Sequence, residues 1–206
     1  MALPLHIFEE RYLSMVNECL DQNRQFGVIL AEPKVGTEVP TGQHTIGTSA
    51  LITHVDRLED GHMDIVTAGL ERFRILDWTR REPYAVARIE PFPLEGTQTQ
   101  ELVDLVKAAS AYFVRYLRLA GDVLGTVIRI ESAPRDASTL AYMMAIALQI
   151  SNDEKQTLLS TPSLPTLLWR EAVILSREEV LLGQMKQVQE ANTGYVRGIS
   201  DYLSLN

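Results

Sequence analysis

The stretch LPLHIFEERY, residues 3–12, changes from a strand pattern to a helix pattern within two residues. Its first apolar residues alternate with others, as in a strand with one buried face: Leu3, Leu5 and Ile7. Pro4 is tolerated near the start of such a strand. Glu9 and Glu10 follow at once, and acidic side chains are favoured at the positive start of a helix. The stretch therefore predicts the corner between a half-buried strand and a helix.

The helix itself is predicted by apolar residues at the spacing i, i+3, i+4, i+7 and i+8, which places them on one face: Tyr12, Met15, Val16, Cys19 and Leu20. After it, short apolar runs or a period of two predict strands over residues 26–31, 46–58, 63–68, 72–78 and 84–92. Residues 33–44 predict a loop. Several short strands with one early helix favour a small, mostly antiparallel barrel or sandwich.

The dipeptide Asp60-Gly61 lies between two of the predicted strands. Both residue types tolerate the positive φ that a type I′ turn requires. The dipeptide therefore predicts a tight hairpin.

The second half of the chain carries helix patterns only. We expect helices over residues 98–119, over a segment that begins near Pro134 with Asp136 or Ser138 as its cap, over 152–160 and over about 165–190. The final residues, 194–206, again place apolar side chains at helical spacing. That tail could pack on its own domain or on a partner such as a second copy of the chain.

Composition restricts the function classes. The chain has 206 residues and a formal net charge of −8, and neither half carries more basic than acidic residues. Proteins that bind nucleic acid usually present a basic surface, so this charge disfavours them. The longest apolar run, residues 140–150, is too short to cross a bilayer. A single cysteine and the absence of a recognisable secretory signal predict a cytoplasmic protein.

Motifs of the common catalytic and cofactor sites are missing from the sequence. It contains no phosphate-binding loop and no dinucleotide-binding glycine pattern, and its four histidines lack metal-ligand spacing. Cys19 lies on the apolar face of the first helix and is interpreted as a buried hydrophobic residue. We therefore expect no catalytic residues, no cofactor and no metal.

Five signals occur in one order along the first half: PLHIFEERY, FGV at residues 26–28, IGT at 46–48, the Asp-Gly hairpin, and GLERFR at 69–74 ahead of Pro83 and Tyr84. This order and spacing resemble the amino-terminal substrate-recognition domain of Lon proteases. The helical half resembles the bundle behind that domain more weakly. The chain lacks the ATP-binding loop, so the resemblance is to a free-standing member of the family.

The resemblance implies an α+β fold: an N-terminal PUA-like β pseudo-barrel with an inserted helix, over residues 1–94, and a C-terminal α-helical bundle, over 95–206. Fourteen residues match the family pattern, and most are expected to be architectural: Pro4, His6, Ile7, Phe8, Glu9, Arg11, Tyr12, Phe26, Gly27, Gly47, Thr48, Gly69, Arg72 and Phe73. We expect the aromatic members, Phe8 included, to belong to the core, and the glycines to allow turns or close strand contacts. We also expect Glu9 to pair with Arg72 or Arg11 and to hold the helix against the barrel.

The family pattern usually has a further strand ahead of the residues that match 3–12. Without it, a sheet edge with unpaired backbone groups is expected to be open, unless something else covers it.

The leading functional hypothesis is a noncatalytic module that binds unfolded or exposed hydrophobic polypeptide segments. It would do so in an apolar groove between barrel and bundle or by strand addition at an open edge. Further partners that we consider are a protease, a chaperone or a second copy of the chain. We expect no binding to a membrane. The alternative is a PUA-like RNA or nucleotide binder. The third hypothesis is a peptidase that uses Ser49 or Ser110 with a distant lysine, and we disfavour it.

Overall fold

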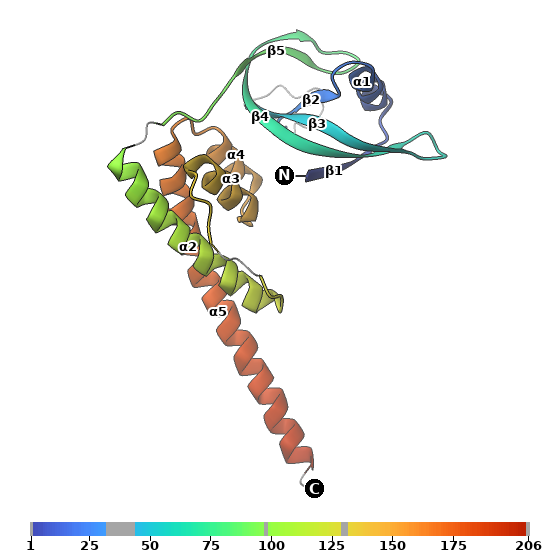
Figure 1. The fold of residues 1–206 in the computed structure, drawn as a ribbon. Coiled ribbons are helices and arrows are strands. Elements are labelled where there is room, and N and C mark those ends of the chain that lie inside the picture. Colours follow the sequence, from blue (N-terminus) through green and yellow to red (C-terminus); the bar gives the residue numbers. More distant parts are fainter. Residues whose placement is uncertain (1, 32–43, 97–98, 129–131, 205–206) are drawn as a thin grey trace. The chain divides into compact units, whose positions relative to one another are not determined.

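The computed structural model describes residues 2–31, 44–96, 99–128 and 132–204, with the side chains of residue 190 and of residues 192–204 left out. The chain forms two compact units (Figure 1). The first unit contains Met1–Pro93 together with Ser151–Pro162, and the second contains Leu94–Ile150 and Ser163–Asn206. Residues 151–162, which the sequence analysis assigns to the helical half, thus belong to the first unit. The division into domains at residues 94 and 95 stays a prediction.

The first unit is built on an antiparallel sheet of five strands: β1 (Ala2–Ile7), β2 (Gln25–Val28), β3 (Ile46–Arg57), β4 (Met63–Arg80) and β5 (Val86–Pro91). The strand order is β1-β4-β3-β2, and β5 also pairs with β4. β1 pairs with the first part of β4 and β5 with the last part. Because β4 bends between these two parts, β1 and β5 lie on different sides of the unit (Figure 1). The predicted α+β class with an antiparallel barrel is confirmed.

β4 replaces two of the expected strands. The sequence analysis separates 63–68 from 72–78, but the structure joins them in one strand of 18 residues. The β3–β4 pairing is shifted between Thr48 and Ala50 and again between Ile52 and His54, and the β4–β5 pairing is shifted at two further places. Such bulges bend a strand and increase its twist without ending it. Residues 69–71, which separate the two expected strands, are therefore part of one curved strand.

The β3–β4 hairpin is present, but its turn is not type I′. The N–H of Gly61 donates to the carbonyl of Leu58, and the N–H of Leu58 donates to that of His62. Only Gly61 has a positive φ here, +85°. The loop is therefore longer than two residues, and Asp60 is not required to adopt the left-handed conformation.

Helix α1 (Glu10–Asp21) begins directly after the first strand, as the opening stretch predicts. Glu9 is its N-cap residue and Glu10 lies in its first turn, while β1 alternates between exposed and half-buried positions. Val16 of α1 packs with Ile52, Met63 and Ile65 of the sheet, and these four side chains are buried. This cluster fastens the helix to the sheet, since burying apolar side chains of this size stabilises by about 1.5–3 kcal/mol each.

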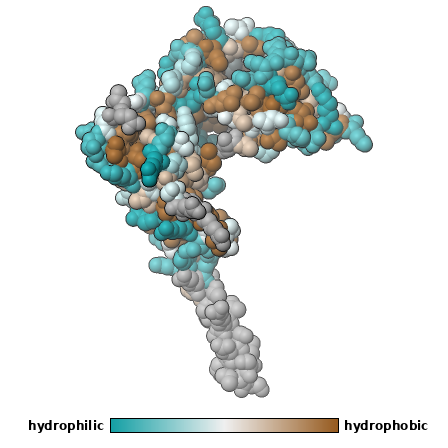
Figure 2. Space-filling view, viewed as in Figure 1, coloured by the Kyte–Doolittle hydropathy of each residue, from teal (hydrophilic) through white to brown (hydrophobic). Residues whose placement is uncertain are grey.

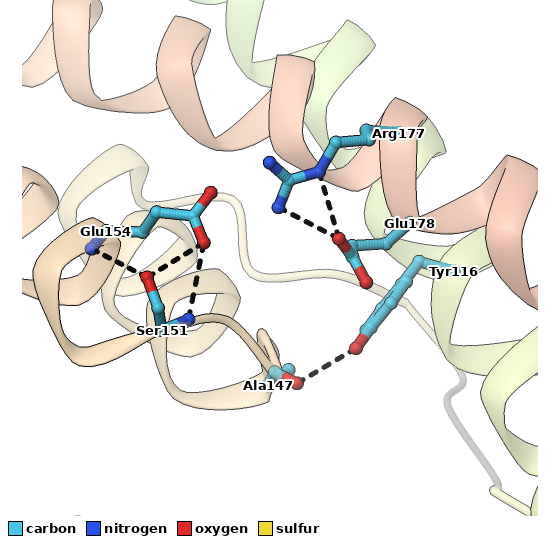
Figure 3. Close-up of polar contacts among 6 residues, drawn as sticks. All are labelled: Tyr116, Ala147, Ser151, Glu154, Arg177 and Glu178. Atoms are coloured by element: carbon cyan, nitrogen blue, oxygen red, sulfur yellow. Dashed lines mark hydrogen bonds and ion pairs between the residues drawn. The ribbon is translucent and has the colours of Figure 1, made fainter.

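Helix α4 (Asn152–Leu159) is held to the first unit by two polar side chains. Arg72 donates through Nη1 to the carbonyls of Leu159 and Thr161, at 2.8 Å each. Gln156 donates through Nε2 to the carbonyl of Ile46 at 3.0 Å. The helix begins with a capping box between Ser151 and Glu154 (Figure 3), which satisfies donors that the first helical turn leaves unpaired.

The second unit consists of α2 (Gln100–Leu124), α3 (Ala137–Ala147) and α5 (Leu164–Ser204). Arg115 pairs with Glu179 and Asp122 with Lys186, so α2 and α5 run side by side in the same direction. The hydroxyl of Tyr116 donates to the carbonyl of Ala147 at the end of α3 (Figure 3). Asp136, one of the two expected caps, accepts from the N–H of Thr139.

Two further expectations concern Phe8 and the loop at 33–44. Phe8 is 58% exposed, so its assignment to the core is wrong. It follows Ile7 by one residue and therefore lies out of phase with the inward residues of β1, against the rings of His6 and His62. The expected loop at 33–44 falls almost wholly on residues 32–43, outside the described part, as do the side chains of the tail.

No helix in the described residues is long and apolar enough to cross a membrane.

Candidate functional site

The first unit contains an apolar cleft of about 660 Å³, which we call the barrel cleft. Its walls come from α1, from all five strands and from the segment that joins β4 to β5. A volume of this size is typical of protein sites for ligands. The cleft lies within one unit, so its geometry is complete without the second unit.

The floor of the barrel cleft is formed by the inward faces of strands and one face of a helix. β1 contributes every second residue, Leu3, Leu5 and Ile7, and β4 contributes Phe73 and Ile75. The lining residues of α1 and its C-cap also follow one helical stripe: Arg11, Tyr12, Met15, Glu18, Cys19 and the C-cap Gln22. The alternation that predicted a half-buried strand and an amphipathic helix thus produces the cleft directly.

Arginine side chains are concentrated around this apolar floor. Arg11, Arg80 and Arg81 line the barrel cleft, and Glu18 is the only acidic residue among its described lining. Arg11 also pairs with Glu9, at 2.6 Å, and lies over the ring of Tyr12. The local charge therefore opposes the negative charge of the whole chain.

The hydroxyl of Tyr84, in the segment between β4 and β5, donates to the carboxylate of Glu18 on α1. This hydrogen bond raises the pKa of Tyr84, and burial adds to the effect. The guanidinium of Arg80 lies 4.5 Å from the centre of the Tyr84 ring. Tyr84 thereby connects two sides of the cleft, α1 and the segment between β4 and β5.

Two potential nucleophiles line the barrel cleft, but neither is activated. The hydroxyl of Ser49 donates to the carbonyl of Glu71 and accepts from the N–H of the same residue. Burial raises the pKa of the Cys19 thiol, and the charge of Glu18 raises it further. The thiolate is the reactive form of cysteine, so this environment makes Cys19 less reactive. Among the described residues, no three metal-ligating side chains lie close enough together to hold an ion.

The fourteen residues named from the sequence divide into two sets. Six line the barrel cleft: Ile7, Arg11, Tyr12, Phe26, Gly27 and Phe73. The other eight lie elsewhere: Pro4, His6, Phe8, Glu9, Gly47, Thr48, Gly69 and Arg72. The functional role of any of them stays a prediction.

Glu9 pairs with Arg11, one of its two expected partners. Both residues lie at the start of α1, so this ion pair does not connect the helix to the barrel. Arg72, the other expected partner, instead donates to two carbonyls at the end of α4, those of Leu159 and Thr161.

Two of the fourteen residues, His6 and Phe8, lie together at the surface with the neighbouring His62. His6 pairs with Asp64 through Nδ1 at 2.7 Å, and His62 pairs with Asp60 at 3.1 Å. The ring centres of the two histidines are 5.4 Å apart.

Five cleft residues at the end of β4, at the start of β5 and between them are not among the fourteen named from the sequence: Trp78, Arg80, Arg81, Tyr84 and Val86. The pair Arg80-Arg81 is visible in the sequence as a local basic cluster. Its position across from α1 depends on the bend of β4, which arises from pairing between distant residues. A local pattern contains no signal for that bend.

Comparison with known proteins gives consistent results. The family model of the ATP-dependent protease La (LON) substrate-binding domain matches residues 1–177. Lon protease of Syntrophus aciditrophicus is 27% identical over 92% of this chain, and Lon protease of Dictyoglomus thermophilum is 23% identical over 92%. The chain spans about a quarter of the length of these curated relatives, 25% and 24% respectively.

Solved structures share the fold. The N-terminal domain of Mycobacterium avium complex Lon protease has a TM-score of 0.61 at 20% identity, over 85% of this chain and 90% of that one. A Lon N-terminal domain protein from Xanthomonas campestris has a TM-score of 0.55 at 22% identity, over 82% and 86%. The family match, which spans the barrel and most of the helical residues, shows that this chain belongs to the Lon substrate-binding domain family.

Proposed function

We propose that this chain binds exposed apolar segments of other polypeptides in the barrel cleft and does not cleave them. The observation that carries the proposal is a ligand-sized cleft, apolar at its floor, in a member of a substrate-binding family. Apolar surface that is removed from water stabilises a complex by about 25 cal/mol per Å², and this term does not depend on sequence details. Such a site would bind many unfolded segments weakly.

The noncatalytic part of the proposal rests on the lining of the cleft. The hydroxyl of Ser49 exchanges two hydrogen bonds with the backbone of Glu71, so its hydrogen-bonding partner among the described residues is not a side-chain base. Cys19 is held in its thiol form by its raised pKa. Bond cleavage would need an activated nucleophile or a general base. We place the protein in the cytosol, where a protease, a chaperone or a second copy of the chain would be its stable partner.

Suppression of client aggregation tests this function. The pure protein, without ATP, is expected to slow the aggregation of heat-denatured malate dehydrogenase and of chemically denatured luciferase. It should leave both clients at full length on a gel. No effect on either client would refute polypeptide binding, and ATP-independent fragments would refute the noncatalytic assignment.

A matched pair of variants locates the effect. Ile89 lines the barrel cleft and Leu76 does not, yet both side chains are 50% exposed on neighbouring strands of the first unit. Ile89→Asp is expected to abolish most of the suppression, because it places a carboxylate in the apolar site. Leu76→Asp should keep it. Equal loss in both variants would mean that general surface hydrophobicity, which both units display in Figure 2, explains the binding.

RNA or nucleotide binding is the second candidate. Three arginines and the rings of Tyr12, Trp78 and Tyr84 line the same cleft, and bases stack on such rings. Two of these rings are already covered, Tyr12 by Arg11 and Tyr84 by Arg80. The polypeptide is therefore the better supported ligand.

A further inference from the structure

The residues that line the barrel cleft distinguish the faces of strands from their edges. Successive side chains of a strand point to opposite faces, so a cavity against one face touches every second residue. β1 and the middle of β4 show this alternation. Five consecutive residues of the β2 segment line the cleft instead: Gln25, Phe26, Gly27, Val28 and Ile29. The cleft therefore meets β2 at its edge.

That edge has no strand beside it in the described part of the chain. β2 is the last strand in the order β1-β4-β3-β2 and pairs only with β3 among the described strands. Residues Tyr84–Val86 and Ala87, at the start of β5, also line the cleft consecutively, so a second strand edge lies on its other side. The barrel cleft is thus bordered by two strands, and neither pairs with another described strand on the side towards the cleft.

The hydrogen bonds of β2 identify which backbone groups point into the cleft. The N–H of Ile52 donates to the carbonyl of Arg24, and the register pairs Phe26 with Ala50 and Gly27 with Ser49. In an antiparallel ladder, hydrogen-bonded pairs alternate with pairs whose N–H and C=O groups point away from each other. Phe26 and Val28 therefore bond β3, whereas Gln25 and Gly27 point to the open edge.

A side-chain contact supports this assignment. The N–H of Gln25 donates to Oδ1 of its neighbour Asn23 at 3.1 Å, and so is directed away from β3. The N–H and C=O of Gly27 are the groups at the middle of the open edge. Gly27 has no side chain of its own, so another backbone can approach it closely.

We infer that the barrel cleft takes an extended polypeptide segment that pairs with the edge of β2 and inserts every second side chain into the apolar floor, between α1 and the strands β1 and β4. The segment is specified by the site: apolar residues at alternate positions, for the floor of β1 and β4, and acidic residues beside them, for Arg11, Arg80 and Arg81. Main-chain hydrogen bonds supply affinity in such strand addition, and the alternate pockets supply selectivity. This inference rests on the proposed function and assigns its site and its ligand conformation.

The direct test uses a synthetic peptide of sequence DLTVSLTVD, acetylated and amidated, and the whole protein labelled with ¹⁵N. Saturating peptide is expected to slow hydrogen exchange at the Gly27 amide by at least about tenfold, because it gains a backbone acceptor. The amides of Phe26 and Val28 serve as internal references, since they are already bonded to β3. Binding without protection of Gly27 would overturn strand addition and leave polypeptide binding standing.

Two control peptides test the pattern. DLLVVTTSD has the same composition with its apolar residues in one block, and KLTVSLTVK reverses the flanking charge. Both are expected to bind at least about tenfold more weakly in fluorescence anisotropy. Equal affinity of the block peptide would overturn the alternating insertion, and equal affinity of the lysine peptide would overturn the acidic flank. A peptide that fails to bind at all, while aggregation of denatured clients is still suppressed, would overturn the inference but not the proposed function.

A pair of variants isolates the backbone donor. Gly27→Pro removes the N–H that points into the cleft, at a position that does not bond β3. Gly27→Ala keeps that N–H, yet it adds the same Cβ, whose nearest neighbour would be the tip of the Phe73 ring at 3.0 Å. We expect the proline variant to bind DLTVSLTVD about tenfold more weakly than the alanine variant, with both folded by circular dichroism. Equal affinities in two folded variants would contradict pairing at Gly27.

Discussion

At the scale of single residues, Gly47 shows how closely the sheet is packed. A Cβ at this position would lie 2.5 Å from the carbonyl oxygen of Val28, 2.6 Å from Cγ2 of Ile29 and 2.7 Å from Cζ of Phe73. All three distances are below van der Waals contact, and one neighbour is backbone. The role expected for the family-pattern glycines, close contact between strands, therefore has a concrete basis at Gly47.

Gly47→Ala is expected to destabilise the protein by about 1–3 kcal/mol, because overpacked atoms must move apart. Urea unfolding followed by circular dichroism measures the change. Gly69→Ala is the matched control, since its Cβ would meet only Cγ2 of Thr48, at an ordinary 3.5 Å. Its free energy of unfolding should change by less than about 0.5 kcal/mol. Similar losses in both variants would show that strand flexibility, and not contact, explains the glycine at 47.

Glu171, on α5, is the other residue with an unusual environment. Its side chain is 0% exposed, and neither carboxylate oxygen has a hydrogen-bond partner among the described residues. Burial raises the pKa of this carboxyl to about 9. The group is therefore protonated at neutral pH, and no sequence pattern distinguishes it from the other acidic residues of the same helix, such as the half-buried Glu178 and Glu179.

This pKa predicts a pH dependence of stability. In the unfolded chain the carboxyl has its ordinary pKa of 4.5, so between about pH 4.5 and 9 the folded state holds a proton that the unfolded state releases. The stability contributed by the protonated form is complete below pH 4.5. It is lost progressively as the pH rises to about 9, by on the order of 1 kcal/mol per pH unit.

Glu171→Gln removes the titration and keeps the shape of the side chain. We expect the difference in unfolding free energy between the variant and the parent to move in favour of the variant from pH 5 to pH 8. Denaturant titrations at these two values measure it. Any effect of the amide that does not depend on pH would shift the free-energy difference equally at pH 5 and pH 8. A difference that does not vary with pH would rule out the raised pKa.

At the scale of elements, α4 illustrates how a segment joins a unit far from it in sequence. Arg72 on β4 is buried, and its Nη1 donates to the carbonyl of Leu159, the last residue of the helix, and to that of Thr161 just after it. Its guanidinium also lies 4.8 Å from the ring centre of Phe92. A buried carbonyl that loses its donor destabilises the fold by about 1–3 kcal/mol. These two hydrogen bonds of Arg72 therefore hold α4 in place.

Arg72→Met should lower the free energy of unfolding by about 2 kcal/mol and accelerate hydrogen exchange in α4 (Asn152–Leu159) selectively. Arg74→Met is the control, because Arg74 lies over the same Phe92 ring, at 4.7 Å, and pairs with Glu90 at the surface. Exposed ion pairs contribute less than about 1 kcal/mol. If exchange in α4 is equal in the two variants, Arg72 does not anchor the helix.

Elements were predictable in proportion to how local their causes are. The amphipathic stripe of α1 and the caps at Asp136 and Ser151 depend on residues within one or two turns, and these helices occur where the sequence places them. β4 was predicted as two strands because the bulges near its middle arise from pairing with β3, a strand that lies elsewhere in the sequence. Phe8 was misassigned for a different reason: it was placed in the core as an aromatic residue, although the alternation of Leu3, Leu5 and Ile7 already puts it on the outward face.

At the scale of the whole molecule, charge decides between the two candidate ligands. The chain has 27 acidic and 19 basic residues, yet the barrel cleft has three arginines and one glutamate in its described lining. A local basic lining suits an acidic flank on a short segment. A nucleic acid needs a longer basic surface, because counterion release from many phosphates supplies its affinity.

A short single-stranded RNA is therefore expected to show no binding at physiological salt, and only weak binding in low salt, when measured by fluorescence anisotropy. The peptide DLTVSLTVD, measured alongside it, provides the positive control. Tight RNA binding whose affinity falls steeply as salt increases would favour the RNA alternative over polypeptide binding.

The sequence by itself determined the α+β class, the amphipathic faces of β1 and α1, and the family to which the chain belongs. These follow from local periodicity, capping chemistry and the order of short motifs. Only the tertiary structure decided that β4 bends, that the edges of β2 and β5 border one cleft, and that Glu171 is buried with no hydrogen-bond partner in the described part of the chain. Such features depend on contacts between residues distant in sequence, whose free energies no local pattern contains.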